Sequence, residues 1–131
     1  MDARPLFGVR VLLVDDDADS AETTTLILVH HGAEVVAVTN APAALLHSIT
    51  FKPHVLVTDL AMPTMDGFEL LRKFRAAGDT FPAIAISAHA EESYLERGKV
   101  AGFAAYLVKP VQPGTLVDTI LAVLKNSPAA G

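Results

Sequence analysis

Five short apolar runs alternate with longer stretches of mixed polarity along the chain. Each run has four or five residues and is bounded by turn-forming or charged residues. Runs this short and this apolar are typical of strands that are buried on both faces of a parallel sheet. The pattern therefore predicts five strands, at Val11–Val14, Val35–Val38, Val55–Thr58, Ala83–Ile86 and Ala104–Val108.

The stretches between these runs carry signals of helix ends. Asp19 and Glu22 stand in the spacing of a capping box, and Gly32 is placed to end the helix that they would begin. Asn40 and Asp66 are side chains that cap the first turn of a helix, so a second and a third helix are expected to begin there.

Two further helices are expected in the last third of the chain. Residues 91–101 contain few apolar side chains, so this helix should be the more exposed one. Pro113 suits the first turn of the last helix, whose apolar face is predicted to hold Leu116, Val117, Ile120, Leu121 and Leu124. Five strands alternating with five helices indicate an α/β fold, a parallel sheet with right-handed crossovers.

Four of the five predicted strands end in chemically useful side chains. The carboxyl ends of parallel strands meet at one edge of a sheet, where ligands of open α/β sheets bind. We therefore expect these groups to lie together: Asp15, Asp16 and Asp17 after the first strand, Asp59 after the third, Ser87 after the fourth and Lys109 after the fifth.

Such a cluster has a clear chemical consequence. Two carboxylates ~4 Å apart repel by roughly 4 kcal/mol at an effective dielectric constant of 20, so three of them need a cation or protons. Mg²⁺ suits few carboxylates, waters and phosphate oxygens, and Lys109 and Ser87 add an ammonium and a hydroxyl. This set is typical of phosphoryl transfer, in which a carboxylate can be the nucleophile. Asp59 is the best candidate because it stands alone at a strand end.

The sequence resembles the receiver domains of the two-component response-regulator family. The matching segments are VLLVDDD at 11–17, VLVTDLAMPTMDGFELL at 55–71, AISA at 85–88 and YLVKP at 106–110. The resemblance covers residues 9 to about 125. It implies a flavodoxin-like, doubly wound (βα)5 fold with strands in the order 2-1-3-4-5.

The resemblance also implies a phosphoacceptor and a Mg²⁺ site. Asp59 matches the aspartate that receives a phosphoryl group from a phosphohistidine. Asp16 matches a direct Mg²⁺ ligand, and Asp15 its neighbour, which often acts through water. Ala61 matches the residue whose backbone carbonyl binds the metal, together with the carboxylate of Asp59.

Other matching residues imply a switch. Ser87 matches the hydroxyl that turns toward the phosphoryl group, Tyr106 the aromatic switch residue, and Lys109 the lysine that contacts the phosphoryl group. The bond between Lys109 and Pro110 matches one that is usually cis, although only about 5–6% of bonds before proline are cis in folded proteins. Ala61 and His89 occupy places that tune the phosphoryl lifetime in the family.

The chain is expected to be a single receiver domain over residues 1–131, with a core at 9–125 and tails at 1–8 and 126–131. No output domain follows Lys125, so the domain is expected either to act alone or to belong to a longer chain, such as a hybrid sensor kinase. The expected partners are a histidine kinase or histidine phosphotransfer domain, a downstream effector and a second copy of the chain. The expected role is signalling, with self-catalysed phosphoryl acceptance and slow autodephosphorylation rather than enzymatic turnover.

Composition excludes several other classes of function. Ten basic and fifteen acidic residues leave a net charge of -5, which disfavours direct nucleic-acid binding and adhesion to anionic membranes. The chain has no cysteine, which excludes disulfides, cysteine-based zinc sites and thiol nucleophiles. No apolar run reaches ~18 residues, and residues 1–10 lack the apolar core of a signal peptide, so a cytoplasmic location is expected.

Two alternatives stay open at this level. One is a receiver-like module that binds partners constitutively, without phosphorylation. The other is a small Mg²⁺-dependent phosphatase that forms an aspartyl-phosphate, with Asp15 as nucleophile and Asp17 as acid and base. That class usually needs a cap domain and a second acidic pair late in the chain, and this sequence has neither.

Overall fold

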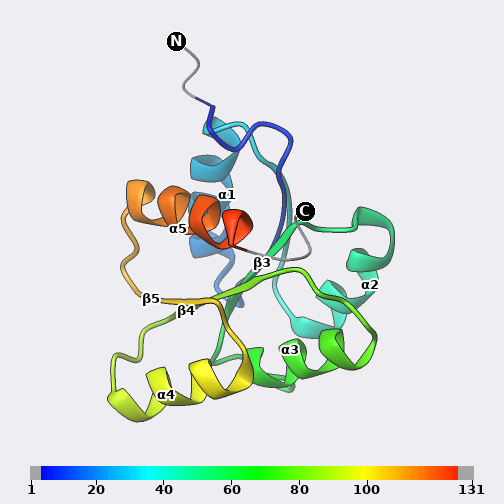
Figure 1. The fold of residues 1–131 in the computed structure, drawn as a ribbon, viewed down its shortest axis with the longest axis vertical. Coiled ribbons are helices and arrows are strands. Elements are labelled where there is room, and N and C mark those ends of the chain that lie inside the picture. The colour runs from blue at the N-terminus through cyan, green and yellow to red at the C-terminus, as the bar shows by residue number, and fades with distance from the viewer. Residues whose placement is uncertain (1–3, 127–131) are drawn as a thin grey trace.

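A computed structural model describes residues 4–126 of the chain as one five-stranded parallel sheet in the order β2-β1-β3-β4-β5 (Figure 1). The predicted flavodoxin-like order is therefore confirmed. The strands are β1 (Arg10–Val14), β2 (Glu34–Val38), β3 (Val55–Asp59), β4 (Ala83–Ser87) and β5 (Ala105–Val108). Each predicted strand is present, with bounds that differ by at most one residue at either end.

Five helices cover the two faces of the sheet (Figure 1). They are α1 (Ala18–His30), α2 (Ala41–Phe51), α3 (Gly67–Ala76), α4 (Glu92–Ala101) and α5 (Pro113–Lys125). Buried residues of α1 and α5 share one apolar cluster with Val11 and Leu13 of β1. Residues of α2 and α3 share the other cluster with Leu12 and Val14, as the alternation of side chains along a strand requires. In the described part of the chain, no helix has both the length and the apolarity needed to cross a membrane.

The five strands are not equally buried. Every residue of β3 and β4 is buried, as is β1 beyond its first residue. In β2 only Val38 is buried, and β5 contains no buried residue. The expectation of strands buried on both faces is therefore wrong for β2 and β5. Both lie at an edge of the sheet, so each lacks one neighbouring strand.

The N-cap of the first helix lies two residues before the predicted one. Asp17 is the N-cap of α1, and its carboxylate accepts hydrogen bonds from the N–H groups of Asp19 and Ser20. The predicted capping box of Asp19 and Glu22 is therefore wrong. The predicted caps Asn40 and Asp66 are confirmed, since each side chain accepts a hydrogen bond in the first turn of its helix.

The last two helices test the predicted faces. In α4 only Gly98 is buried, as expected for an exposed helix. In α5 the buried residues are Leu116, Val117, Ile120 and Val123, whereas Leu121 is 37% exposed. The prediction that Leu121 belongs to the buried face is wrong, because counted from Leu116 the helix buries its i, i+1, i+4 and i+7 positions, and Leu121 is i+5.

The segment before β1 packs against the molecule. Leu6 lies in the predicted tail 1–8, yet its side chain is fully buried in the cluster of α1 and α5. Its N–H donates a hydrogen bond to the carbonyl of His31 at 2.8 Å. Residues 1–3 and 127–131 of the predicted tails lie outside the described residues.

Candidate functional site

Asp59 ends the central strand β3 at the carboxyl edge of the sheet. Its side chain is 10% exposed, and its neighbour Thr58 is fully buried. One carboxylate oxygen, Oδ1, accepts a hydrogen bond from the N–H of Ala61 at 3.2 Å. The other, Oδ2, accepts one from Nζ of Lys109 at 2.9 Å. The residue that stood alone at a strand end is therefore a nearly buried carboxylate held by a cation.

Two more carboxylates join Asp59 at this edge. Oxygen atoms of Asp15, Asp16 and Asp59 all lie within 4.8 Å of one another. Asp15 is fully buried, and its Oδ1 accepts a hydrogen bond from the N–H of Asp17 at 3.0 Å. Asp16 is exposed and gives the cluster a side that faces solvent. The structure thus brings together the three acids that were predicted to bind a metal.

Lys109 connects the acids to the last strand. Its Nζ lies 2.9 Å from Asp59 and 3.4 Å from Asp15, and its side chain is 28% exposed. Burial of the ammonium alone would lower the pKa of Lys109. The hydrogen bond with Asp59 and the charges of Asp59 and Asp15 outweigh burial, so the pKa of Lys109 is raised. The bond between Lys109 and Pro110 is cis, as the resemblance implied.

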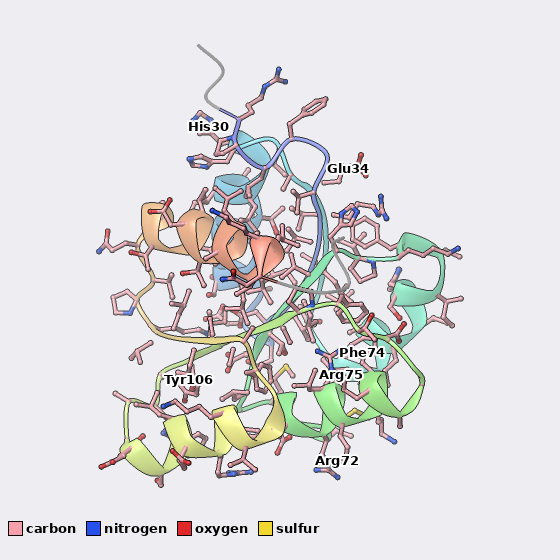
Figure 2. All side chains as sticks on the ribbon, in the orientation of Figure 1. His30, Glu34, Arg72, Phe74, Arg75 and Tyr106 are labelled. Carbon is pink, nitrogen blue, oxygen red and sulfur yellow. The ribbon has the colours of Figure 1, made fainter. Side chains whose placement is uncertain are left out.

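The two predicted switch residues meet at His89. Ser87 is fully buried at the end of β4, and its Oγ accepts a hydrogen bond from the N–H of His89 at 3.1 Å. Tyr106 belongs to β5 and lies beside α4 (Figure 2). Its hydroxyl donates a hydrogen bond to the carbonyl of His89 at 2.9 Å. Gly98 of α4 leaves room for the Tyr106 ring, because a Cβ there would lie 2.9 Å from Cδ2 of that ring.

Sequence reasoning did not assign a role to Tyr94. Its ring stacks on the ring of His89, with centroids 4.3 Å apart and planes 5° apart. His89 also places Nδ1 3.3 Å from a carboxylate oxygen of Glu91. The only signal in the sequence was an aromatic residue in the first turn of the helix that follows His89, and its spacing does not show that the rings stack.

Asp17 follows the acids of the cluster in the sequence, but its carboxylate has a structural role. It is exposed, and its carboxylate caps α1. Asp15, the other member of the predicted phosphatase pair, is buried and contacts Lys109. The complete burial of Asp15 disfavours its use as a nucleophile, and the capping of α1 disfavours Asp17 as its acid-base partner.

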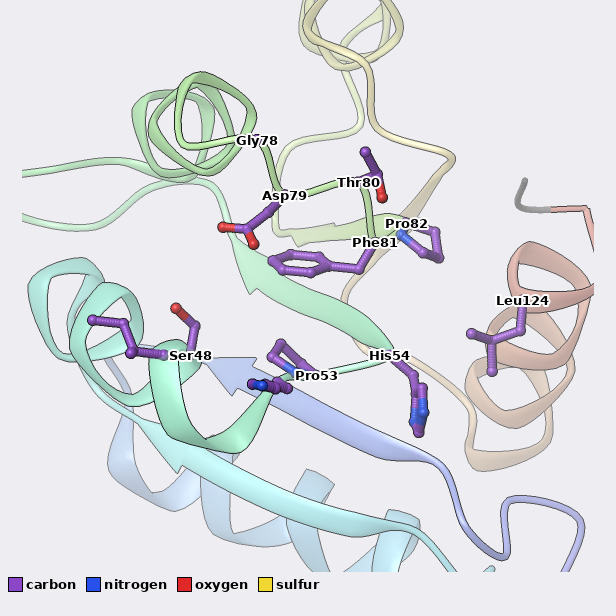
Figure 3. Close-up of a pocket in the computed structure, with 11 residues that line it drawn as sticks. Ser48, Pro53, His54, Gly78, Asp79, Thr80, Phe81, Pro82 and Leu124 are labelled. Carbon is purple, nitrogen blue, oxygen red and sulfur yellow. The ribbon is translucent and has the colours of Figure 1, made fainter. Parts of the chain in front are cut away.

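A cavity of about 460 Å³ lies at the opposite edge of the sheet (Figure 3). None of its lining residues belongs to the acid cluster. They include Ser48, Lys52, His54, Asp79, Phe81 and Leu124.

Comparison with known proteins places the chain among receivers. The family model of the response regulator receiver domain matches residues 11–121. PilH of Pseudomonas aeruginosa is 33% identical, over 88% of this chain and 97% of PilH. A 14.6 kDa protein from the sodA1 3′ region of Leptolyngbya boryana is 42% identical, over 84% of this chain and 86% of that protein. Response regulator MprA of Mycobacterium tuberculosis is 33% identical, over 92% of this chain, which spans only 52% of MprA.

Solved structures agree with this placement. Chemotaxis response regulator CheY4 of Vibrio cholerae superposes with a TM-score of 0.81 at 28% identity, covering 88% of this chain and 98% of CheY4. A CheY-like receiver domain protein of Methanospirillum hungatei superposes with a TM-score of 0.85 at 29% identity, over 94% of this chain and 98% of that one. The chain therefore belongs to the response regulator receiver domain family, the phosphoacceptor signalling domains of two-component systems.

Proposed function

We propose that Asp59 is the phosphoacceptor of this receiver. An Asp59 oxygen attacks the phosphorus of a phosphohistidine, the bond between phosphorus and the histidine nitrogen breaks, and that nitrogen leaves with the electron pair. The observation that carries the proposal is the position of Asp59: a nearly buried carboxylate, 2.9 Å from the Lys109 ammonium and clustered with two further acids.

The residues present fit a Mg²⁺ ion. Asp15, Asp16 and Asp59 offer hard oxygen ligands within 4.8 Å of one another, and three neighbouring carboxylates favour a bound cation. We assign these three side chains and the backbone carbonyl of Ala61 to the metal. When bound, Mg²⁺ would neutralise charge on the phosphoryl oxygens.

Lys109 and Ser87 would serve the phosphoryl group directly. The raised pKa of Lys109 keeps its ammonium charged at neutral pH, ready to contact a phosphoryl oxygen. The phosphoryl group of the product carries about -1.5 to -2 charge units at pH 7, in place of the single charge of the carboxylate. A Ser87 hydroxyl that turned toward this charge would give up the N–H of His89, whose carbonyl holds Tyr106. Ser87 and Tyr106 would in this way form one two-state switch.

The wider role follows from the family. The phosphoryl donor would be a histidine kinase or a histidine phosphotransfer domain, and a downstream effector would bind the switched surface. A homodimer, slow autodephosphorylation and a cytoplasmic location complete the proposal. Mg²⁺ is its one cofactor.

Intact-mass measurement tests the acceptor. The wild-type protein is incubated with Mg²⁺ and a small acyl phosphate, beside Asp59→Asn and the matched control Asp79→Asn at the other edge of the sheet. We expect a gain of one phosphoryl group, about 80 Da, in the wild type and in Asp79→Asn, and none in Asp59→Asn or with a chelator.

The other outcomes discriminate the alternatives. A gain that persists in Asp59→Asn would refute the assignment of the acceptor. Steady phosphate release without an adduct would favour the phosphatase, and neither adduct nor release would favour a constitutive interaction module.

A further inference from the structure

Helices α3 and α4 bound a surface groove of about 680 Å³. Its volume falls within the range of roughly 300–1,000 Å³ typical of ligand sites. We name it the α3–α4 groove and define it by Phe68, Arg72, Arg75, Glu96, Arg97 and Val100. None of these residues takes part in the proposed phosphoacceptor chemistry.

The groove is basic although the chain is acidic. The sequences of α3 and α4 hold five of the ten basic residues of the protein but only three of its fifteen acidic residues. Three arginines line the groove, against one glutamate. A local positive surface on a chain of net charge -5 attracts acidic partners and orients them.

Two of the arginines are open to a ligand. The guanidinium of Arg97 lies 4.1 Å from the centroid of the Phe68 ring and 5.5 Å from that of Tyr94. This stacking holds the guanidinium while leaving its N–H edge for a carboxylate. Arg72 projects outward from α3 (Figure 2). Within residues 4–126, neither Arg72 nor Arg97 forms an ion pair.

Arg75 differs from these two. Its guanidinium donates hydrogen bonds to the carbonyls of Asp79 and Phe81, at 2.9 and 2.7 Å. It therefore holds the end of α3 in place and contributes charge to the groove, rather than a free hydrogen-bonding edge.

An apolar position lies in the same groove. Val100 is 80% exposed, the most exposed of the large apolar side chains described. Aromatic and aliphatic surface next to arginine is typical of the core of a protein interface. The groove thus offers one apolar contact and two cationic contacts.

We propose that the α3–α4 groove binds an acidic segment of a partner protein. An apolar side chain of that segment packs on Val100, and its carboxylates pair with Arg72 and Arg97. A second copy of this chain suits the groove less well, because a symmetric contact would bring the same arginines face to face. The proposal goes beyond the phosphoacceptor function and does not depend on it.

Peptide selection tests this surface. Short random peptides displayed on phage are selected on the wild-type protein without a phosphodonor, at about 0.15 M salt, where charges more than roughly 8 Å apart are screened. We expect enriched peptides with net negative charge and a large apolar residue. Binding of the enriched peptides is then measured by fluorescence anisotropy.

The variants locate the contact. Arg72→Glu/Arg97→Glu should weaken binding about tenfold, and Val100→Ser about fivefold. The matched control Lys73→Glu/Lys99→Glu changes the same net charge on the same two helices but outside the groove lining, and should stay within about twofold. Circular dichroism confirms that each variant is folded.

Several results would overturn the proposal. Enriched peptides without an acidic excess would do so, as would equal binding to Arg72→Glu/Arg97→Glu or an equal loss in the lysine control. Sedimentation is the last check: if the wild type self-associates and the arginine variant does not, the occupant is a second copy and the acidic partner is refuted.

Discussion

The two edges of the sheet both carry a basic side chain, but each uses it differently. At the carboxyl edge, Lys109 lies within 3.4 Å of two carboxylates. At the amino edge, Nε of Arg10 donates hydrogen bonds to the backbone carbonyls of Phe51 and Lys52, at 3.0 and 2.9 Å. Phe51 is the last residue of α2 and Lys52 is its C-cap, so neither carbonyl has a partner within the helix.

The pKa shifts at the two edges have opposite directions. The acids at the carboxyl edge raise the pKa of Lys109. Burial, and then the charge of Arg10, lowers the pKa of His54 at the amino edge, where its Nδ1 accepts a hydrogen bond from the N–H of Arg10. The amino edge also holds the cavity of about 460 Å³. The lining of that cavity mixes polar and apolar side chains, whereas opposite charges face one another at the carboxyl edge.

The largest difference between the edges should appear on removing each basic group. Lys109→Met should slow labelling of the protein by an acyl phosphate about 100-fold, because a charge aimed at the phosphoryl group is lost. Arg10→Met should leave the labelling rate within about twofold. Initial rates from intact mass give both values, and equal slowing in the two variants would contradict the proposed division of roles.

Lys109→Met should also destabilise the fold. We expect a loss of about 1–3 kcal/mol in the free energy of unfolding, below the value for a fully buried pair because Lys109 is 28% exposed. A raised pKa in the folded state stabilises it at every pH below the ordinary lysine value, and this stabilisation disappears as pH rises through the folded-state value. Urea titrations should show the gap between wild type and variant closing at alkaline pH, and a gap that widens there would contradict the ion pairs.

Substitution of two glycines, one near each edge of the sheet, should have effects of intermediate size. A Cβ on Gly67 would lie 2.5 Å from the backbone oxygen of Asp59, so Gly67→Ala must move the start of α3 and the end of the acceptor strand apart. We expect a loss of about 2–3 kcal/mol in stability and about tenfold slower labelling.

Gly78 at the amino edge is the matched control. It has a φ of 93°, and a Cβ added there would meet no atom within 4 Å, so Gly78→Ala should cost about 1–2 kcal/mol through backbone strain alone. Its labelling rate should equal that of the wild type. Chemical denaturation and intact mass provide the two readouts, and normal labelling of Gly67→Ala would show that Asp59 tolerates the shift.

The smallest effect concerns pH at the amino edge. Because the pKa of His54 is lowered in the folded state, the unfolded chain binds more protons below the ordinary value of 6.5. The free energy of unfolding should therefore decrease as pH falls from 6.5 toward the folded-state pKa of His54. His54→Asn keeps an acceptor for the N–H of Arg10 but has no titrating side chain at this position, so its stability should not decrease for this reason. Urea midpoints measured from pH 7.5 to about pH 5 should fall less in the variant than in the wild type, and parallel curves would refute the coupling.

Much of the candidate site could be predicted because parallel strands bring their carboxyl ends to one edge. Asp15, Asp59, Ser87 and Lys109 each follow an apolar run, so their placement needed only the number and direction of the strands. The caps Asn40 and Asp66 were predictable for a different reason, since each bonds to N–H groups within its own turn.

Other features depended on neighbours that the sequence pattern does not name. The runs of β2 and β5 look like those of the central strands, and only their places at the sheet edges leave them partly exposed. The choice between Leu121 and Val123 depended on the rotation of α5 against the sheet. The stack of His89 on Tyr94 and the α3–α4 groove arise where a loop and two helices meet.

The sequence by itself determined the alternation of strands and helices, most of their ends and the group of residues at the carboxyl edge. These features follow from interactions between residues close along the chain and from one rule about parallel sheets. Only the tertiary structure decided that Lys109 bridges Asp15 and Asp59, that Ser87 and Tyr106 share His89, and that arginines gather beside Val100. Those contacts join residues of separate elements, so they exist only once the elements have packed.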